Sequence, residues 1–212
     1  MSLLLHFRLT PHSLPHRCEG CQQRFSVEHA MTCKKGGLIL LCHNDLSSEW
    51  QELCAQAPSP SAVSDEPLIH NGQGQQEGGA DVQRTEPLPE IRGDVSAHGF
   101  WTRGTTVIFD IRVRDTECPS QRGSDPGVSL KCHEVEKKWK YLVHCECQRK
   151  HFTPLVFSVD VMMGMECDAT RKRLVSCLAT LWKWTYSEVC SFVRSRLAIA
   201  LVQSASWCLW WY

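Results

Sequence analysis

The chain has 212 residues, of which 23 are Lys or Arg and 23 are Asp or Glu, so its formal net charge is zero. Apolar residues make up 42% and charged residues 22%, values that allow a folded core and exclude a collagen-like, wholly disordered or strongly basic protein. A broad cationic surface for nucleic acid is therefore not expected, whereas a local basic patch is compatible with this charge.

The cysteine content bears on the compartment of the protein. Thirteen cysteines are present, an odd number that disulfide bonds alone cannot pair. Residues 1–8 hold a short apolar run, but no basic start precedes it and no small-residue cleavage site follows, so no secretory signal is predicted. The apolar run at residues 197–202 is too short to cross a bilayer. We therefore expect an intracellular protein, nuclear or cytoplasmic rather than secreted or membrane-bound, whose cysteines are reduced or bind metal.

The first chemical motif along the chain combines three cysteines and a histidine, namely Cys18, Cys21, His29 and Cys33. Zinc in a structural site takes four such ligands in a tetrahedron. The two-residue gap lets Cys18 and Cys21 reach one ion across a tight turn, which Gly20 suits. One helical turn would place His29 and Cys33 on the same face. The motif predicts a structural zinc site, and the alternative is a set of core thiols without metal.

The residues after this motif leave two alternatives open. Cys42 and His43 form a second candidate ligand pair, although adjacent residues chelate one ion awkwardly. Lys34 and Lys35 follow the last ligand and would either touch nucleic-acid phosphates or form a solvated surface. A module this small lacks an apolar core, so metal binding would supply its folding energy.

Hydrophobic periodicity and local composition predict the order of helices, strands and linkers along the chain. Residues 38–55 are predicted to form a helix, because their leucines and Trp50 recur near one face. Residues 58–90 are rich in Pro, Gly and Gln and are predicted to be a flexible linker, with a strand at residues 67–70 as a further alternative. The second half alternates strands and helices, which indicates an α/β layer. Its predicted elements are strands at 107–113 and 152–159 and helices at 131–149, 168–183 and 187–203.

The predicted core of this second half rests on its tryptophans and on one helix stripe. Cys132, Val135, Trp139 and Leu142 recur every three or four residues, so this side of the helix at 131–149 is expected to face the core. Trp101 and Trp139 are expected to be buried there.

Two acidic residues are candidates for a magnesium site. Asp110 interrupts an apolar strand, where an unpaired buried charge would be costly. If a neighbouring strand carried Asp94 beside it, the two carboxylates would bind Mg²⁺, which prefers hard oxygen ligands. Such an ion activates water and stabilises charge on a scissile phosphate. Arg112 points to the same face as Asp110 and would clamp a phosphate, although it is a poor base.

The predicted helix at 131–149 and its end supply most of the nearby positive charge. Lys138 lies at the border of the apolar stripe, a position that could project toward Asp110. Residues 131–151 carry six Lys or Arg against three Glu, a local excess that suits a phosphate backbone. The alternative is a solvated helix face with i,i+4 ion pairs. The candidate nucleic-acid contacts in this region are Lys140, Arg149 and Lys150.

Several short stretches together carry a resemblance to a known family. They run in order along most of the chain: residues 18–30 (CEGCQQRFSVEHA), 33–38 (CKKGGL), 43–45 (HND), 92–94 (RGD), 99–101 (GFW), 108–116 (IFDIRVRDT), 136–141 (EKKWKY) and 151–155 (HFTPL). The sequence resembles the C-terminal tail of non-LTR retrotransposon polyproteins, downstream of their reverse transcriptase domain. In such elements this tail is similar to a zinc knuckle followed by a restriction-like endonuclease of the PD-(D/E)xK class.

The resemblance implies a fold and a set of functional residues. The implied fold is α/β (α+β), a restriction-endonuclease-like mixed sheet flanked by helices and preceded by the zinc knuckle. Asp94 and Asp110 match the two metal-binding acids, and Arg112 stands where the catalytic lysine is typical. Some members of the class draw that lysine from the following helix, so Lys138 or Lys137 is expected to replace it.

The resemblance also implies boundaries. We expect a non-homologous N-terminus at 1–17, a zinc knuckle with a short helix at 18–57, a linker at 58–90, an endonuclease-type domain at 91–203 and a Trp-rich tail at 204–212. The reverse transcriptase is absent from this chain, and both ends are expected to be read-through of a truncated element.

Three functions follow as hypotheses. The first is a Mg²⁺-dependent DNA endonuclease that nicks a target strand. The second is a zinc-dependent module that binds DNA or RNA without cutting it. The third is a relic of a retroelement without function.

Overall fold

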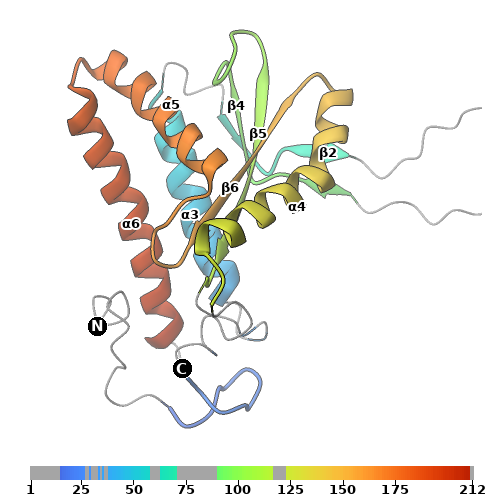
Figure 1. Cartoon of the computed structure of the whole chain (residues 1–212), viewed down its shortest axis with the longest axis vertical. Helices are drawn as coiled ribbons and strands as arrows, with labels where there is room; N and C mark the ends of the chain where they lie inside the picture. The colour runs from blue at the N-terminus through green and yellow to red at the C-terminus, as the bar shows by residue number, and fades with distance from the viewer. Residues whose placement is uncertain are drawn as a thin grey trace, which may run out of the picture.

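The computed structural model of the chain describes residues 15–26, 29, 33, 35, 38–57, 63–70, 90–116 and 123–210. Four helices and six strands are assigned among these residues (Figure 1). In chain order they are α3 (Leu38–Ala55), β1 (Val63–Asp65), β2 (Leu68–His70), β3 (Ile91–Arg92), β4 (Val95–His98), β5 (Thr106–Arg114), α4 (Pro126–Cys147), β6 (His151–Ser158), α5 (Met165–Trp182) and α6 (Tyr186–Trp210).

The strands form a mixed sheet with the order β1-β4-β5-β6. β4 lies antiparallel to both β1 and β5, whereas β5 and β6 are parallel and pair from Val107 opposite His151 to Arg114 opposite Ser158. A parallel pair requires a crossover, and α4 supplies it. β2 and β3 form a separate two-stranded antiparallel sheet. The predicted α/β class with a mixed sheet flanked by helices is therefore confirmed.

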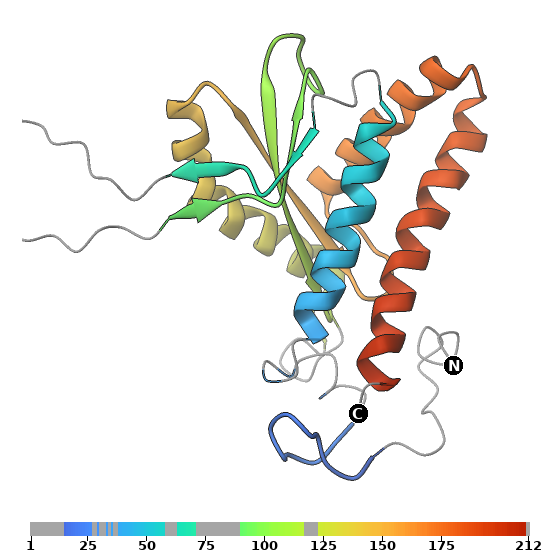
Figure 2. The same ribbon diagram turned by 180° about the vertical axis from the view of Figure 1, so that it is seen from behind.

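Helices cover both faces of the four-stranded sheet. α4 lies on one face in Figure 1, while α3 and α6 are in front when the molecule is seen from behind in Figure 2. The strand β5 divides its side chains between these layers: Phe109 and Ile111 belong to the core beneath α3, α5 and α6, whereas Ile108 packs with Tyr141 of α4. Asp110 alternates with Phe109 and Ile111, so its side chain is on the α4 face.

The α3 helix spans the residues predicted for it, but it is part of the main core. Leu46, Trp50 and Leu53 are fully buried, and the Trp50 ring packs edge-on against Phe109 of β5, with 5.7 Å between ring centroids. The predicted boundary after residue 57 therefore divides elements that share one core.

Two further predicted boundaries differ from the structure. The predicted linker contains β1 and β2, of which β1 pairs with β4; residues 71–89 lie outside the described part of the chain. The predicted tail begins inside α6, which continues to Trp210, and the buried Ser204 hydroxyl donates to Asp45 Oδ2 at 2.7 Å. Residues 1–14 and the last two residues are also outside the described part.

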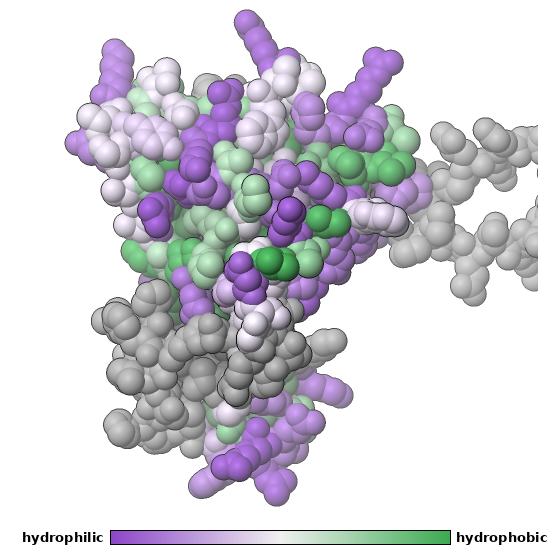
Figure 3. Space-filling view, in the orientation of Figure 1, coloured by the Kyte–Doolittle hydropathy of each residue, from purple (hydrophilic) through white to green (hydrophobic). Residues whose placement is uncertain are grey.

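The prediction that Trp139 marks the core is wrong. Its side chain is 86% exposed, and Val135 and Val143 beside it are exposed as well. The side of α4 that faces the sheet carries Leu130, Tyr141 and Cys145, and in addition the buried Glu134. Because polar residues share this inner side, apolar periodicity assigned the helix the opposite orientation. Figure 3 accordingly shows hydrophobic atoms scattered among hydrophilic ones over α4, which faces the viewer.

The prediction that Trp101 is buried in the core is only partly correct. It is half-buried against the main core, and its indole N–H donates to the Thr153 hydroxyl at 3.1 Å.

Among the residues that the structure describes, no helix combines the length and the apolar character that a membrane span requires.

Candidate metal centre and acidic site

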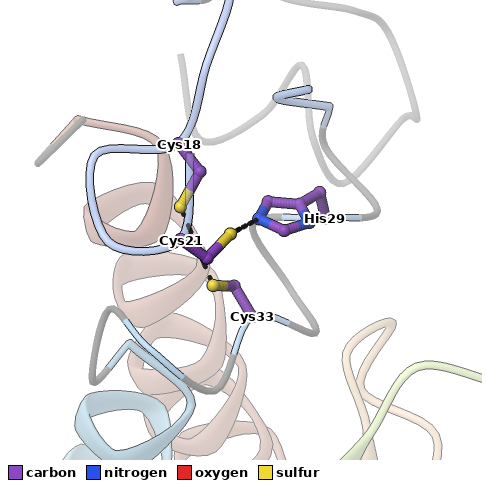
Figure 4. Close-up of side chains that lie close together, drawn as sticks. All are labelled: Cys18, Cys21, His29 and Cys33. Atoms are coloured by element: carbon purple, nitrogen blue, oxygen red, sulfur yellow. Dashed lines mark hydrogen bonds between the residues drawn. The ribbon is translucent and has the colours of Figure 1, made fainter. Parts of the chain in front are cut away.

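The four predicted zinc ligands lie together at the N-terminal end of the described chain (Figure 4). One ligand atom from each of Cys18, Cys21, His29 and Cys33 lies within 4.8 Å of all the others. Cys18 Sγ is 3.7 Å from Cys33 Sγ, and Cys21 Sγ is 3.1 Å from His29 Nε2. This cluster could hold a metal ion, and its ligand set is consistent with zinc.

Local backbone geometry brings these ligands together. The amide of Gln22 donates to the Cys18 carbonyl at 2.7 Å, and the Cys18 amide donates to Gln23 at 2.9 Å, which closes a tight turn. The left-handed residue of this turn is Gln22, with φ of 61°, and not Gly20 as expected. The amide of Cys33 donates to the His29 carbonyl at 2.8 Å, so these two ligands are one helical turn apart as predicted.

The surroundings of the cluster favour a charged thiolate. Burial raises the pKa of Cys18, but hydrogen bonds from the Cys21 backbone and the His29 side chain outweigh it and lower that pKa to about 6. A thiolate is the form that binds metal. Phe25 is buried beside the cluster and packs edge-on against the His29 ring, with centroids 6.3 Å apart. Of the two lysines predicted to touch nucleic acid here, Lys35 is exposed and Lys34 lies outside the described residues.

The second site is built where β4 begins beside the middle of β5. Val95 pairs with Phe109, so Asp94 and Asp110 are the next residues along the two neighbouring strands. The Asp94 amide donates to the Phe109 carbonyl at 2.9 Å, and Asp94 Oδ2 accepts a hydrogen bond from the Ile111 amide. The fold therefore places both predicted acids side by side in the sheet.

A histidine from α3 completes the Asp94 side of this acidic site. His43 Nε2 lies 3.1 Å from Asp94 Oδ1, and both side chains are partly buried. The hydrogen bond with Asp94 raises the pKa of His43 despite the opposing effect of burial. His43 therefore binds the acid in place of the zinc-type cluster for which it was an alternative ligand.

A lysine and a tyrosine from α4 lie on the Asp110 side. Lys137 Nζ is 2.5 Å from Asp110 Oδ2, and the Lys137 ammonium is also 5.5 Å from the Tyr141 ring centroid. Lys137 and Tyr141 are four residues apart and so share one face of the helix, the face turned to the sheet.

The acidic site has a distinct electrostatic character. Asp110 is only 4% exposed, and burial raises the pKa of its carboxyl. Asp94 raises that pKa further through charge repulsion, whereas Lys137 lowers it. Asp94 and Lys137 therefore act on the Asp110 carboxyl in opposite directions, and the two carboxylates and the ammonium interact electrostatically with one another.

The other two predicted catalytic cations have different partners. The helix lysine that reaches Asp110 is Lys137 and not Lys138, which pairs with Glu166 at 2.6 Å. One residue along a helix rotates a side chain by about 100°, so Lys138 cannot share the direction of Lys137. Arg112 Nη1 is 2.8 Å from Glu136 Oε2.

A charged network continues from Arg112 along the seam between β5 and α4. Glu136 Oε2 also lies 3.1 Å from His133 Nδ1, and Arg114 Nε donates to His133 Nε2 at 3.1 Å. The hydrogen bonds from Arg112 and then His133 lower the pKa of Glu136 to about 2.

The remaining predicted nucleic-acid contacts lie near the end of α4. Lys140 Nζ is 4.7 Å from the Tyr141 ring centroid, while Arg149 and Lys150 follow the helix before β6. Arg149 and Lys140 are exposed and Lys150 is half-buried.

Sequence reasoning identified both acids and both candidate lysines, but it missed four residues of these networks. His43, His133, Glu136 and Tyr141 join the acids or Arg112 only through the tertiary fold. Two local signals were present in the sequence: Tyr141 follows Lys137 by four residues, and Glu136 follows His133 by three residues, so each pair shares one face of a helix.

No protein-family model matches the chain, and no curated protein matches it.

Proposed function

We propose that the chain is a metal-dependent nuclease of the restriction-like PD-(D/E)xK type, derived from a non-LTR retrotransposon, and that it hydrolyses phosphodiester bonds in DNA. One observation carries this proposal. Asp94 and Asp110 are side by side on neighbouring strands, and the Lys137 ammonium is 2.5 Å from Asp110. Two acids and one lysine of this arrangement are what the resemblance implies for the class, with the lysine drawn from the helix.

The donor set of the acidic site fits a hard divalent cation. Carboxylate oxygens are the ligands that Mg²⁺ prefers. The repulsion between the two carboxylates, which raises the pKa of Asp110, is the kind of destabilisation that a bound cation relieves. Asp94 and Asp110 would hold the ion. When bound, Mg²⁺ would polarise a phosphoryl oxygen and lower the pKa of a coordinated water.

The residues of the chain have separate roles in this proposal. The Lys137 ammonium would stabilise negative charge on the phosphate during attack by water, as the oxygen of water bonds to phosphorus and one ester bond breaks. The Ile111 amide and His43 fix the two oxygens of Asp94. The Tyr141 hydroxyl and Lys137 hydrogen-bond the Asp110 carboxyl and so fix its orientation.

A second function has its own supporting observation. The Cys3His cluster at residues 18–33 suits a structural zinc ion, and small zinc modules commonly present a rigid surface to nucleic acid. A zinc-dependent module that binds nucleic acid without cutting it would use this cluster and leave the acidic site without a catalytic role.

Nicking of supercoiled plasmid DNA distinguishes the two functions. The zinc-loaded full chain is expected to convert the plasmid to the open-circular form with added Mg²⁺ and not without it. Asp110→Asn removes one proposed metal-binding oxygen and is expected to lower the nicking rate by about 100-fold or more.

The matched control is Asp65→Asn, which makes the same chemical change at an exposed residue of β1. It is expected to nick at the rate of the parent, and thermal melts of both variants report whether they fold. If Asp110→Asn folds and nicks as fast as the control, the nuclease proposal is wrong.

A further inference from the structure

The second half of β5 has a strand neighbour on one side only, among the residues that the structure describes. Its pairing with β4 ends at Phe109, while its pairing with β6 continues to Arg114. The acidic site is at the point where β4 begins, so it lies next to the part of β5 that has no strand partner on this side among the described residues.

Three charged residues follow one another along the α4 face of this segment. Asp110, Arg112 and Arg114 are two residues apart, so their side chains share a face and are spaced by about 6.7 Å. This repeat is on the scale of the distance between neighbouring phosphates of a nucleic-acid strand.

α4 runs antiparallel to β5 and provides a side-chain partner for each of these three residues. Lys137 pairs with Asp110, Glu136 pairs with Arg112, and His133 accepts from Arg114. Because His133 Nε2 accepts this hydrogen bond, its Nδ1–H donates to Glu136. The seam therefore offers a guanidinium and an imidazole N–H that converge on one carboxylate.

The side chains of this seam differ in exposure, and the difference suggests that another anion can replace the Glu136 carboxylate. The side chains of Arg112 and His133 are 21% and 12% exposed, whereas that of Glu136 is 59% exposed. The two donors are held by the fold, and the carboxylate reaches them from the solvent side. A phosphate oxygen approaching from solvent presents the same charge and the same acceptor geometry as this carboxylate.

We propose that Arg112, Arg114 and His133 form a binding row for the backbone phosphates of a DNA strand that lies beside the acidic site, and that Glu136 occupies this row until the nucleic acid displaces it. This inference rests on the proposed function, because the ligand of the row is a phosphodiester strand. It assigns Arg112 to substrate binding, with Lys137 as the cation of the reaction centre.

Fluorescence anisotropy with a labelled DNA duplex tests the row, using the zinc-loaded full chain without added Mg²⁺ so that no cleavage occurs. Glu136→Gln keeps the size of the side chain and removes its charge. It is expected to bind the duplex about 5-fold more tightly and to steepen the dependence of log Kd on log salt by about one phosphate contact. Arg112→Ala is expected to weaken binding about 5-fold and to flatten that dependence by the same amount.

Glu146→Gln is the matched control, because Glu146 is an exposed glutamate of the same helix. It makes the same change in net charge and is expected to alter the affinity by less than about 2-fold. Equal gains in affinity for the Glu136 and Glu146 variants would mean that net charge alone is responsible, and the row would be wrong.

The plasmid assay separates this proposal from the proposed function. A Glu136 variant that gains affinity selectively, in a chain that never nicks DNA, supports the row and contradicts the nuclease. A chain that nicks through Asp110 while the Glu136 and Arg112 variants bind like the parent contradicts the row alone.

Discussion

Asp110 is the residue whose environment most needs an explanation. A carboxylate in an apolar strand is costly to bury, and here burial and Asp94 both raise its pKa, while Lys137 and Tyr141 lower it. Replacing Asp110 alone would leave the Lys137 ammonium without its partner and would be destabilising, whereas replacing the charged groups together by well-packed apolar residues would cost little stability or even increase it. A stable core does not require two facing acids and a lysine at one point, so this arrangement is better explained by chemistry than by folding.

The His43–Asp94 contact predicts a pH dependence of stability. Since the hydrogen bond with Asp94 raises the pKa of His43, the folded state holds a proton more tightly than the unfolded state, whose pKa is about 6.5. The contribution is therefore complete below about pH 6.5 and is lost as pH rises through the higher folded pKa. His43→Gln is expected to cost about 1 kcal/mol more unfolding free energy near pH 6 than near pH 9, as measured by urea denaturation.

His98→Gln is the control for this measurement, because His98 is exposed and bonds a threonine hydroxyl rather than an acid. Its effect on the unfolding free energy is expected to be the same at both pH values. An equal cost of His43→Gln at the two pH values would contradict the ion-pair account.

At the residue scale, the sequence predicted the acids but could not choose among the cations. An acid in the middle of an apolar strand is a strong local signal, and Asp110 was identified by it. The choice between Lys137 and Lys138 depends on the rotation of α4, and that rotation is fixed by contacts of Tyr141 and Cys145 with Ile108 and its neighbours. Sequence periodicity contains no information on these contacts.

At the element scale, helices and long strands were predictable, and among the short strands of the described residues only β2 was anticipated, as an alternative. The bounds of α3 match the prediction, and β5 and β6 differ from it by one residue at each end. α4 begins five residues earlier than predicted, because Asp125 caps it by accepting from the Gly127 amide at 2.8 Å. β1 has three residues and depends on pairing with β4, so a Pro- and Gly-rich composition concealed it, whereas β2 lies within the strand that was an alternative prediction at residues 67–70.

The Cys3His cluster leads to a prediction about the local structure around its four ligands. Its ligands lie outside the main core cluster, so its local structure should depend on metal while the sheet does not. Cys33→Ser is expected to lower zinc content from about one ion per chain to a small fraction of that. Amide hydrogen exchange should become faster around Cys18 and Cys21 and stay unchanged in β5 and β6.

Cys132→Ser provides the comparison, since Cys132 is an exposed cysteine on α4, away from the cluster. This variant is expected to retain its zinc. Full zinc content in the Cys33 variant would show that these four residues are not the metal site.

At the scale of the whole molecule, the acidic site joins the two layers that enclose the sheet. His43 comes from α3 on one face, Lys137 and Tyr141 come from α4 on the other, and the acids come from the strands between them. The sequence placed α3 in a separate zinc module and so could not predict that His43 reaches Asp94. Only the packing of Leu46 and Trp50 into the shared core brings that helix to the site.

The most direct test of the nuclease centre is the Mg²⁺-dependent nicking rate of Lys137→Met at saturating plasmid, measured beside Lys172→Met. Lys172 pairs with Asp168 on the exposed side of α5, and its variant controls for the loss of one lysine charge. Lys137→Met is expected to nick about 100-fold or more slowly than the parent, and Lys172→Met is expected to nick at the parental rate. Parental rates for both folded variants would contradict the assignment of Lys137 to the nuclease centre.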